Sequence, residues 1–329
     1  MSSVLQAASQ SSLLAREKAI AFIKDYFSTQ LCKQLSLIKV AAPLFVKSGT
    51  GLNDDLNGVE RPVAFQLKGV NGGVEIVQSL AKWKRKRLHE LEIPAGHGIV
   101  TDMRAIRPDE VISPIHSFFV DQWDWEKRIA VTDRNIAYLK ETVLAIYAAL
   151  VATNNRLKEE GEAGLELPET VHFIHSETLL QQYPNLTPKE RENACAKKYG
   201  AIFIIGIGAP LSNSQVHDDR APDYDDWTTA NEDGHTGLNG DLIIWNPALN
   251  AALEISSMGI RVDAAALRKQ LKAKNCEQRA EMEFHSNVLS STYPLSMGGG
   301  IGQSRLCMLL LQQKHIADVQ ASVWPEGVR

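Results

Sequence analysis

Most strands predicted from this sequence follow one another directly, with no helix between them. The predicted strands at residues 98–106 and 117–125 are separated by ten residues that include two prolines, and those at 241–246 and 251–257 by four residues that begin with Pro247. A parallel pair needs a crossover of a dozen or more residues, whereas antiparallel neighbours need only a turn. The pattern therefore predicts an α+β protein with an antiparallel sheet flanked by helices, and it disfavours a doubly wound fold.

Three amphipathic stretches supply the expected helices. Residues 12–35 and 133–157 carry apolar side chains at three- and four-residue spacing, and residues 79–90 begin at Ser79, a suitable N-cap. The chain has 329 residues, without an internal repeat or a low-complexity block. We therefore expect a single domain over residues 11–329, preceded by a short flexible arm at residues 1–10.

Composition narrows the choice of partners. The formal net charge of −4 lacks the basic bias of a nucleic-acid-binding protein. The four cysteines lie far apart, which argues against a zinc knuckle or a disulfide framework and fits a reducing compartment. No uninterrupted apolar run reaches the length of a membrane span, and the N-terminus does not resemble a secretory signal. We expect a cytoplasmic protein with small-molecule partners, and neither nucleic acid nor a membrane.

Carboxylates gather where strands and loops meet. Strand alternation places Gln122 and Asp124 on one face beside tryptophans, and Glu254 lies inside another strand. Residues 212–240 form a long polar run rich in Asp, Asn and Gly, and a loop of that length in a compact domain is usually functional. Such carboxylates bind ammonium groups or Mg²⁺, although solvated surface acids are common.

Two further patterns are compatible with phosphate binding. The glycines at 298–302 are expected to open a helix, where backbone approach and the helix N-terminus favour anions, but a plain tight turn explains them equally well. Arg107 follows an apolar strand and could clamp phosphate, or form a surface salt bridge. The basic run at 82–87 most simply forms a solvated helix face. His172 and His175 would point to opposite faces of a strand, so we predict no zinc site.

Three segments together resemble the class II aminoacyl-tRNA synthetase motifs. Residues 37–43, after a long helix, resemble motif one, which forms the dimer in that superfamily. The strand ending in residues 107–110 resembles motif two, and residues 298–305 resemble motif three. The resemblance implies an antiparallel sheet surrounded by helices, with the arginines of motifs two and three on ATP.

Almost the whole chain resembles the ammonia-dependent asparagine synthetases, compact homodimeric relatives of aspartyl- and asparaginyl-tRNA synthetases. The blocks that carry this likeness are, in chain order, residues 79–85, 120–126, 220–227, 237–241, 254–263 and 298–305. The resemblance implies ATP-dependent ligation of aspartate and ammonia through a β-aspartyl-adenylate, giving asparagine, AMP and pyrophosphate. It also implies that Mg²⁺ is required and that the protein is a homodimer.

The same resemblance divides the expected site into two halves. The amino-acid pocket would comprise Asp54, Ser79, Lys84, Gln122, Asp124 and Asp225. The nucleotide side would comprise Arg107, Asp241, Glu254, Ser256, Ser257, Arg261, Gly300 and Arg305.

Each half has an expected chemical task. Asp124 and Asp225 would hold the substrate ammonium, and Lys84 its carboxylate. Asp241 and Glu254 would bind Mg²⁺, which with the catalytic Arg107 and Arg305 offsets the charge of the phosphates. Asp54 is the expected acceptor of the proton that ammonia releases.

Three other functions share parts of this pattern. A tRNA synthetase would carry the same motifs, but we find no segment for an anticodon-binding domain. A non-catalytic paralogue is disfavoured because Arg107, Glu254 and Arg305 are present. Use of glutamine would need a nucleophile, and the chain starts Met-Ser, without a cysteine at position 2.

Overall fold

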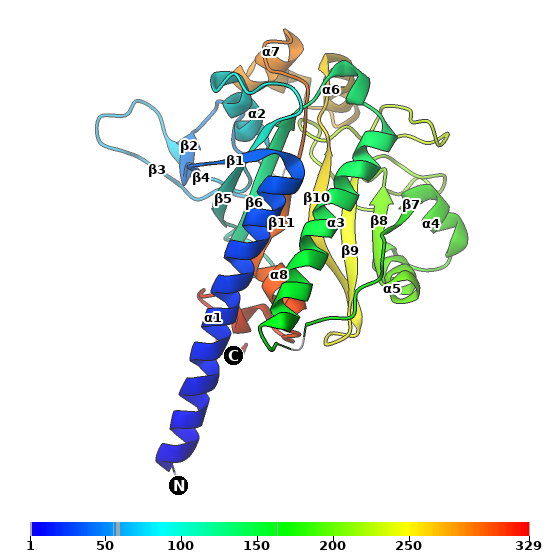
Figure 1. Cartoon of the computed structure of the whole chain (residues 1–329). Helices are drawn as coiled ribbons and strands as arrows, with labels where there is room; N and C mark the ends of the chain where they lie inside the picture. The colour runs from blue at the N-terminus through cyan, green and yellow to red at the C-terminus, as the bar shows by residue number, and fades with distance from the viewer. Residues whose placement is uncertain (1, 55, 57–59, 163, 329) are drawn as a thin grey trace.

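The computed structural model describes residues 2–54, 56, 60–162 and 164–328, with side chains described from residue 13 onward. Its centre is an eight-stranded sheet (Figure 1). In spatial order the strands are β1 (Leu37–Val40), β5 (Gly98–Ile106), β6 (Phe119–Arg128), β11 (Ser296–Gly302), β10 (Ala251–Ile260), β9 (Asn239–Asn246), β8 (Ala201–Ile205) and β7 (His172–His175). A smaller sheet has the order β2 (Phe45–Lys47), β4 (Val74–Ile76), β3 (Ala64–Phe65).

The central sheet is antiparallel except at its two edges. All neighbours from β5 to β8 pair antiparallel, whereas β1 pairs with β5 and β7 with β8 in parallel. Both parallel pairs join strands far enough apart in sequence for a crossover; between β7 and β8 the chain forms α4 (Ser176–Gln182) and α5 (Pro188–Tyr199). The antiparallel sheet predicted from the short connections is confirmed.

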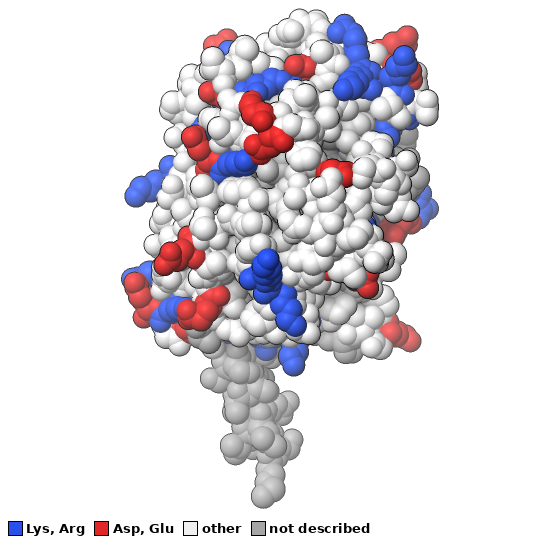
Figure 2. Space-filling model, turned by 90° about the vertical axis from the view of Figure 1, so that its right-hand side faces the viewer, with Lys and Arg blue, Asp and Glu red and all other residues white. Residues whose placement is uncertain are grey.

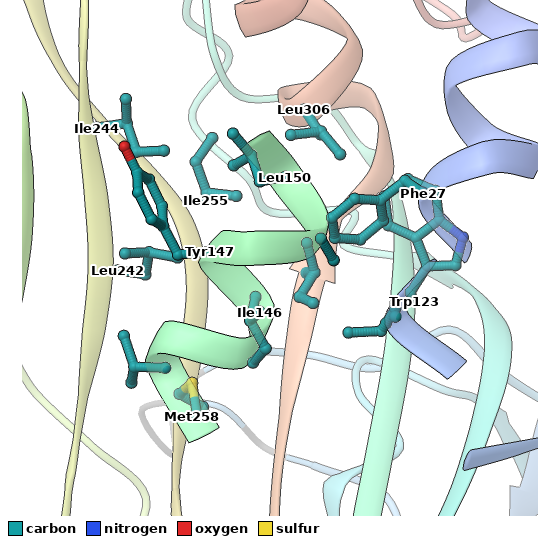
Figure 3. Packing of buried hydrophobic residues seen from close by; sticks show 14 of the residues in the cluster. Phe27, Trp123, Ile146, Tyr147, Leu150, Leu242, Ile244, Ile255, Met258 and Leu306 are labelled. Carbon is teal, nitrogen blue, oxygen red and sulfur yellow. The ribbon is translucent and has the colours of Figure 1, made fainter. Parts of the chain in front are cut away.

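One face of the sheet is covered by α1 (Ser2–Leu35), α3 (Ile136–Glu159) and α8 (Gln303–Leu310). Figure 3 shows the core between them, where Leu150 of α3 packs near Ile255 and Leu306. The rings of Phe27 and Trp123 lie 4.6 Å apart between α1 and β6. Burial of this large apolar surface is the main source of stability for the domain.

The other face is covered by two separate groups of helices. Near β5, α2 (Ala81–Glu90), α6 (Ala264–Ala273), the 3₁₀ turn η2 (Glu277–Glu281) and α7 (Glu283–Leu289) surround a second apolar cluster. At β8 and β9, α4 and α5 enclose a third. Where these groups part, the middle strands present polar side chains to a cavity. The candidate functional site lies there.

The first helix differs from the expectation. α1 begins at Ser2, ten residues before the expected start at residue 12, so the segment predicted as a flexible arm is helical; Met1 lies outside the described residues. The sequence does not reveal this because residues 1–10 are mostly polar or small, and Val4 and Leu5 are adjacent and form no apolar stripe.

By length and composition α3 could cross a membrane, and among the described residues it is the one such helix. Half of its most apolar stretch is buried inside the domain. Packing against α1 and the sheet therefore accounts for its apolar side chains.

The packing of α3 gives a test of the fold. Leu150→Ala should lower the free energy of unfolding by about 2–5 kcal/mol, because Leu150 is fully buried and its removal leaves a cavity. Leu144→Ala on the same helix is the control: Leu144 is 39% exposed, and the loss should stay within about 0.5 kcal/mol. Urea denaturation measures both, and equal losses would contradict the described orientation of α3.

Candidate active site

A cavity of about 530 Å³ opens between the two helix groups, a size typical of small-molecule sites. Its walls come from the segment around Asp54, from β6, β10 and β11, and from the polar loop that precedes β9. Eleven of the expected site residues line it: Asp54, Ser79, Arg107, Gln122, Asp124, Asp225, Glu254, Ser257, Arg261, Gly300 and Arg305. Lys84, Asp241 and Ser256 are not part of the lining.

Lys84 lies beneath the cavity, at the centre of a buried charge network. Its ammonium is fully buried and donates to the Asp124 carboxylate, to the Trp125 carbonyl at 2.8 Å and to the Gly299 carbonyl at 3.2 Å. These three bonds use all three of its N–H donors. The expected contact with the substrate carboxylate therefore does not fit the structure, in which Lys84 fixes Asp124 instead.

Arg261 joins this network to the polar loop. It is buried, pairs with Glu126 through Nη2 at 2.8 Å and Nε at 3.0 Å, and also donates to Asp225. Burial opposes the ionised form of Glu126, but Arg261 and Lys84 outweigh it and hold the pKa of Glu126 below its usual range. Arg261 was expected on the nucleotide side, yet it donates to Asp225, a residue expected in the amino-acid pocket.

Glu126 is a site residue that our sequence reasoning did not select. The signal was present, because strand alternation puts Glu126 on the same face as Gln122 and Asp124. Its place in the charge network depends on Lys84 and Arg261, which approach it from two other elements.

The glycine cluster forms a central strand, which corrects the expected helix-opening turn. Residues 298–302 belong to β11, between β6 and β10, and the helix α8 begins only at Gln303. A Cβ on Gly298 would lie 1.9 Å from Glu126 Oε2, and one on Gly300 would lie 2.2 Å from Gln122 Oε1. These glycines therefore leave room for the polar side chains of β6.

A β-bulge in β10 orients three of the residues expected on the nucleotide side. The register shifts between Glu254 and Ser256, and the core residues Leu253 and Ile255 are followed by Met258, three positions on. A bulge adds one residue and so changes which side chains share a face. Glu254 and Ser257 consequently both line the cavity, whereas Ser256, expected to contact the nucleotide, is buried outside it.

Two partly exposed arginines border this half of the cavity. Arg305 lies 3.6 Å from a Glu254 carboxylate oxygen, and Arg107 lies 3.8 Å from Glu110. Both pairs are longer than a direct hydrogen bond, so these cations keep donors available for an anionic ligand.

Arg220, which sequence reasoning also missed, lines the cavity and pairs with Asp218 at 2.8 Å and with Asp241. Asp241 itself lies behind it, buried, with Oδ1 lacking a hydrogen-bond partner among the described residues. Burial raises the pKa of Asp241 to about 7, and Glu254 adds to this effect while Arg220 opposes it. In the sequence, Arg220 opens the block 220–227 that carries the family resemblance, and only Asp225 of that block was predicted as a site residue.

No group of three or more His, Cys, Asp or Glu side chains within the described ranges could hold a metal by itself. Asp241 and Glu254 suit a metal ion that the protein binds together with a substrate. Mg²⁺ is usually held by one or two carboxylates together with substrate phosphates and water. A cation there would also compensate the unfavourable burial of Asp241.

The amino-acid sequence is similar to a known protein family over nearly its whole length. A family profile described as aspartate-ammonia ligase matches residues 14–329. The chain is 54% identical over 315 residues to aspartate–ammonia ligase from Parabacteroides distasonis, covering 95% of this chain and 91% of that protein. It is 51% identical over 319 residues to that of Clostridium perfringens, with 96% and 92% covered.

Solved structures agree on the fold. The structure of asparaginyl-tRNA synthetase from Entamoeba histolytica, in complex with asparaginyl-adenylate, superposes with a TM-score of 0.67 at 15% identity, covering 94% of this chain and 66% of that one. The enzyme from Pyrococcus horikoshii, also complexed with asparaginyl-adenylate, gives 0.67 at 14% identity, covering 94% and 70%. The fold is thus that of the class II synthetases.

The packing of β11 predicts unequal effects of adding one methyl group. Gly298→Ala should displace Glu126 from Arg261 and destabilise the protein by about 3–5 kcal/mol, because a buried charge loses its partner. In Gly302→Ala, on the same strand, the nearest atom is Arg305 Cβ at 3.3 Å, a mild crowding that a shift of a few tenths of an ångström relieves, so the change should be about 1 kcal/mol or less. Chemical denaturation compares the two; similar stabilities would show that Glu126 has room to move.

Proposed function

The chain belongs to the aspartate–ammonia ligase family, and we propose that its cavity joins ammonia to the side-chain carboxylate of aspartate through an adenylate. The family makes asparagine from aspartate and ammonia, and this chain is such an enzyme. The observation that supports the adenylate route is the division of the cavity, with buried carboxylates at one end and the cationic Arg107 and Arg305 at the other.

The chemistry requires these two ends. A carboxylate is a poor electrophile until its oxygen becomes part of a good leaving group, and transfer of AMP from ATP provides one, releasing pyrophosphate. Attack on the α-phosphate brings negative charges together, which Arg107 and Arg305 would offset. Two of the similar folds hold asparaginyl-adenylate, a compound of the same class.

At the amino-acid end we assign the substrate ammonium to Asp124 and Asp225, with Gln122 beside them. Arg261, which lines the cavity, is better placed than Lys84 for the α-carboxylate of aspartate. Ser79 at the rim donates a 2.7 Å hydrogen bond to Asp54 and so fixes that carboxylate. Orientation by these groups leaves the β-carboxylate directed to the nucleotide end.

At the nucleotide end we assign ATP to Arg107, Arg305, Ser257 and Gly300. Glu254, with Asp241 behind it, would hold Mg²⁺, which would help neutralise the phosphates. Arg220 pairs with Asp241 and lines the same wall, so we add it to the groups that face the phosphates.

Small-molecule partners suit the surface as well. On the face that carries α4 and α5, lysine and arginine side chains are interspersed with aspartate and glutamate (Figure 2). A nucleic-acid-binding face would gather basic side chains into a patch. We therefore propose that the enzyme acts on free aspartate in the cytoplasm, without a nucleic-acid or membrane partner.

We also propose a homodimer. The edge strand β1 and its neighbours α1 and β2 expose apolar side chains, among them Leu14, Ile38 and Leu44. An exposed edge strand with apolar side chains is a site for association. This is the segment whose sequence resembles motif one.

The reaction itself provides the decisive assay. With aspartate, ATP, Mg²⁺ and ammonium, the purified chain should form asparagine and AMP in equal amounts, and ADP in place of AMP would overturn the adenylate route. Arg107→Ala should lower adenylation by about two to three orders of magnitude, measured as aspartate-dependent ATP–pyrophosphate exchange. Arg104→Ala is the matched control on β5, since that side chain is mostly exposed and outside the cavity, and it should keep near-native exchange.

Sedimentation equilibrium tests the homodimer. The 36.3 kDa chain should behave as a particle of about 73 kDa at micromolar concentration. Ile38→Glu should shift it toward the monomer, because the charge would be buried at the interface. Val323→Glu changes a still more exposed side chain outside α1, β1 and β2 and should leave the mass unchanged, and a monomeric wild-type chain would contradict the proposal.

A further inference from the structure

Gln78 is a buried residue of the cavity wall that none of the assignments above uses. It precedes Ser79 and α2, is 1% exposed and lines the cavity. Its side-chain Nε2 donates to the Asp54 carbonyl at 3.0 Å, and its main-chain N–H donates to Asn53 Oδ1 at 3.0 Å. The first bond fixes the amide orientation, because the reversed amide would bring two carbonyl oxygens together.

The fixed orientation leaves an acceptor without a donor. Gln78 Oε1 is buried and has no hydrogen-bond partner among the described residues. Leaving such an oxygen unpaired costs about 1–3 kcal/mol, so nearly all buried polar atoms in proteins are satisfied. At the wall of an active site, a ligand that donates a hydrogen is the natural partner.

The position of Gln78 indicates which ligand. The main-chain carbonyl of Gln78 accepts a hydrogen bond from Arg107 Nη2 at 3.4 Å, and its side-chain amide donates to the main-chain carbonyl of Asp54. Gln78 therefore lies where the phosphate-binding arginine meets the amino-acid half. In an adenylate the acyl carbon is bonded through oxygen to the α-phosphate, so this carbon must lie close to the same junction.

We propose that Gln78 Oε1 and the Asp54 carboxylate form the binding site for ammonia, an inference that rests on the proposed function. Ammonia has three N–H donors and one lone pair. Two acceptors on the protein can take two of those hydrogens and leave the lone pair free to face the acyl carbon. Ammonium fits the same two acceptors, and Asp54 can remove its extra proton before attack.

The transfer step balances with these groups alone. The nitrogen lone pair forms the C–N bond, and the bond between the acyl carbon and the phosphate oxygen breaks, its electron pair leaving with AMP. The nitrogen then carries one proton too many for an amide, and this proton passes to a carboxylate oxygen of Asp54 or, when Asp54 already holds one, to the departing phosphate. Gln78 stays neutral and exchanges no proton.

The test is a substitution that removes the acceptor but keeps the volume. Gln78→Met should raise the KM for ammonium about five- to tenfold, the loss expected for one hydrogen bond. Aspartate-dependent ATP–pyrophosphate exchange needs no ammonia and should stay within about twofold of the wild type. Gln78→Ala, which adds no bulk, repeats the measurement if the methionine variant does not fold.

Two control variants separate ammonia binding from general disturbance. Gln320→Met changes a second buried glutamine of the cavity wall, which also has an unpaired Oε1 but bonds to Ser304, and it should leave the ammonium KM unchanged. Asn53→Ala is the positive control: Asn53 Oδ1 accepts from the main-chain N–H groups of both Asp54 and Gln78, so its loss should disturb both acceptors and raise the ammonium KM more than it lowers exchange.

Each other result overturns the inference in a recognisable way. A raised KM for aspartate or ATP in Gln78→Met, with the ammonium KM unchanged, would assign the oxygen to another ligand. A loss of exchange in Gln78→Met as large as its loss of ammonium use would mean that Gln78 shapes the whole site and does not bind ammonia. If the wild-type chain forms no asparagine from ammonium, the proposed function itself fails, and that failure is seen without any variant.

Discussion

The structure of this site depends on one group of buried charges. Lys84 and Arg261 lie among the carboxylates of Glu126, Asp124 and Asp225, and these five side chains come from α2, β6, the end of β10 and the polar loop. Two cations among three carboxylates leave one negative charge, which suits the substrate ammonium that we propose binds there. Buried ion pairs add little net stability compared with apolar packing, but loss of one partner is costly. The group therefore fixes the relative positions of four elements and gives this part of the pocket a net negative charge.

The order of helices and strands could be predicted from the sequence, because apolar side chains recur at a different spacing in each. The alternation in β6 correctly separates Trp123 and Trp125, which face α1 and α3, from Gln122 and Asp124, which face the cavity. It could not predict β11, because a run of glycines has no side-chain pattern. The reason for that strand lies on its neighbours, where Glu126 and Gln122 occupy the space that Cβ atoms would fill.

The candidate site, too, could be predicted only in part. Resemblance to a family selected eleven residues of the lining, but not which of them bind ligand and which bind other parts of the protein. Lys84 looked available because its helix is strongly basic, yet all of its donors are used inside the protein. Arg220, Glu126 and Gln78 were missed because their importance comes from partners distant in sequence: Asp241, Arg261 and the backbone of Asp54.

The bulge in β10 makes the length of that strand as important as its composition. Before it, Leu253 and Ile255 face the core, and after it Met258 and Ile260 do so, while Glu254 and Ser257 face the cavity. Deletion of one residue at the bulge would reverse the face on which every later side chain of β10 lies. Met258 and Ile260 would then point into the cavity, and Ser257 would point into the apolar interior. Insertions and deletions in this segment would therefore remove the hydrophobic packing and the chemistry in one event. In the evolution of the chain, β10 can change its side chains but not its number of residues.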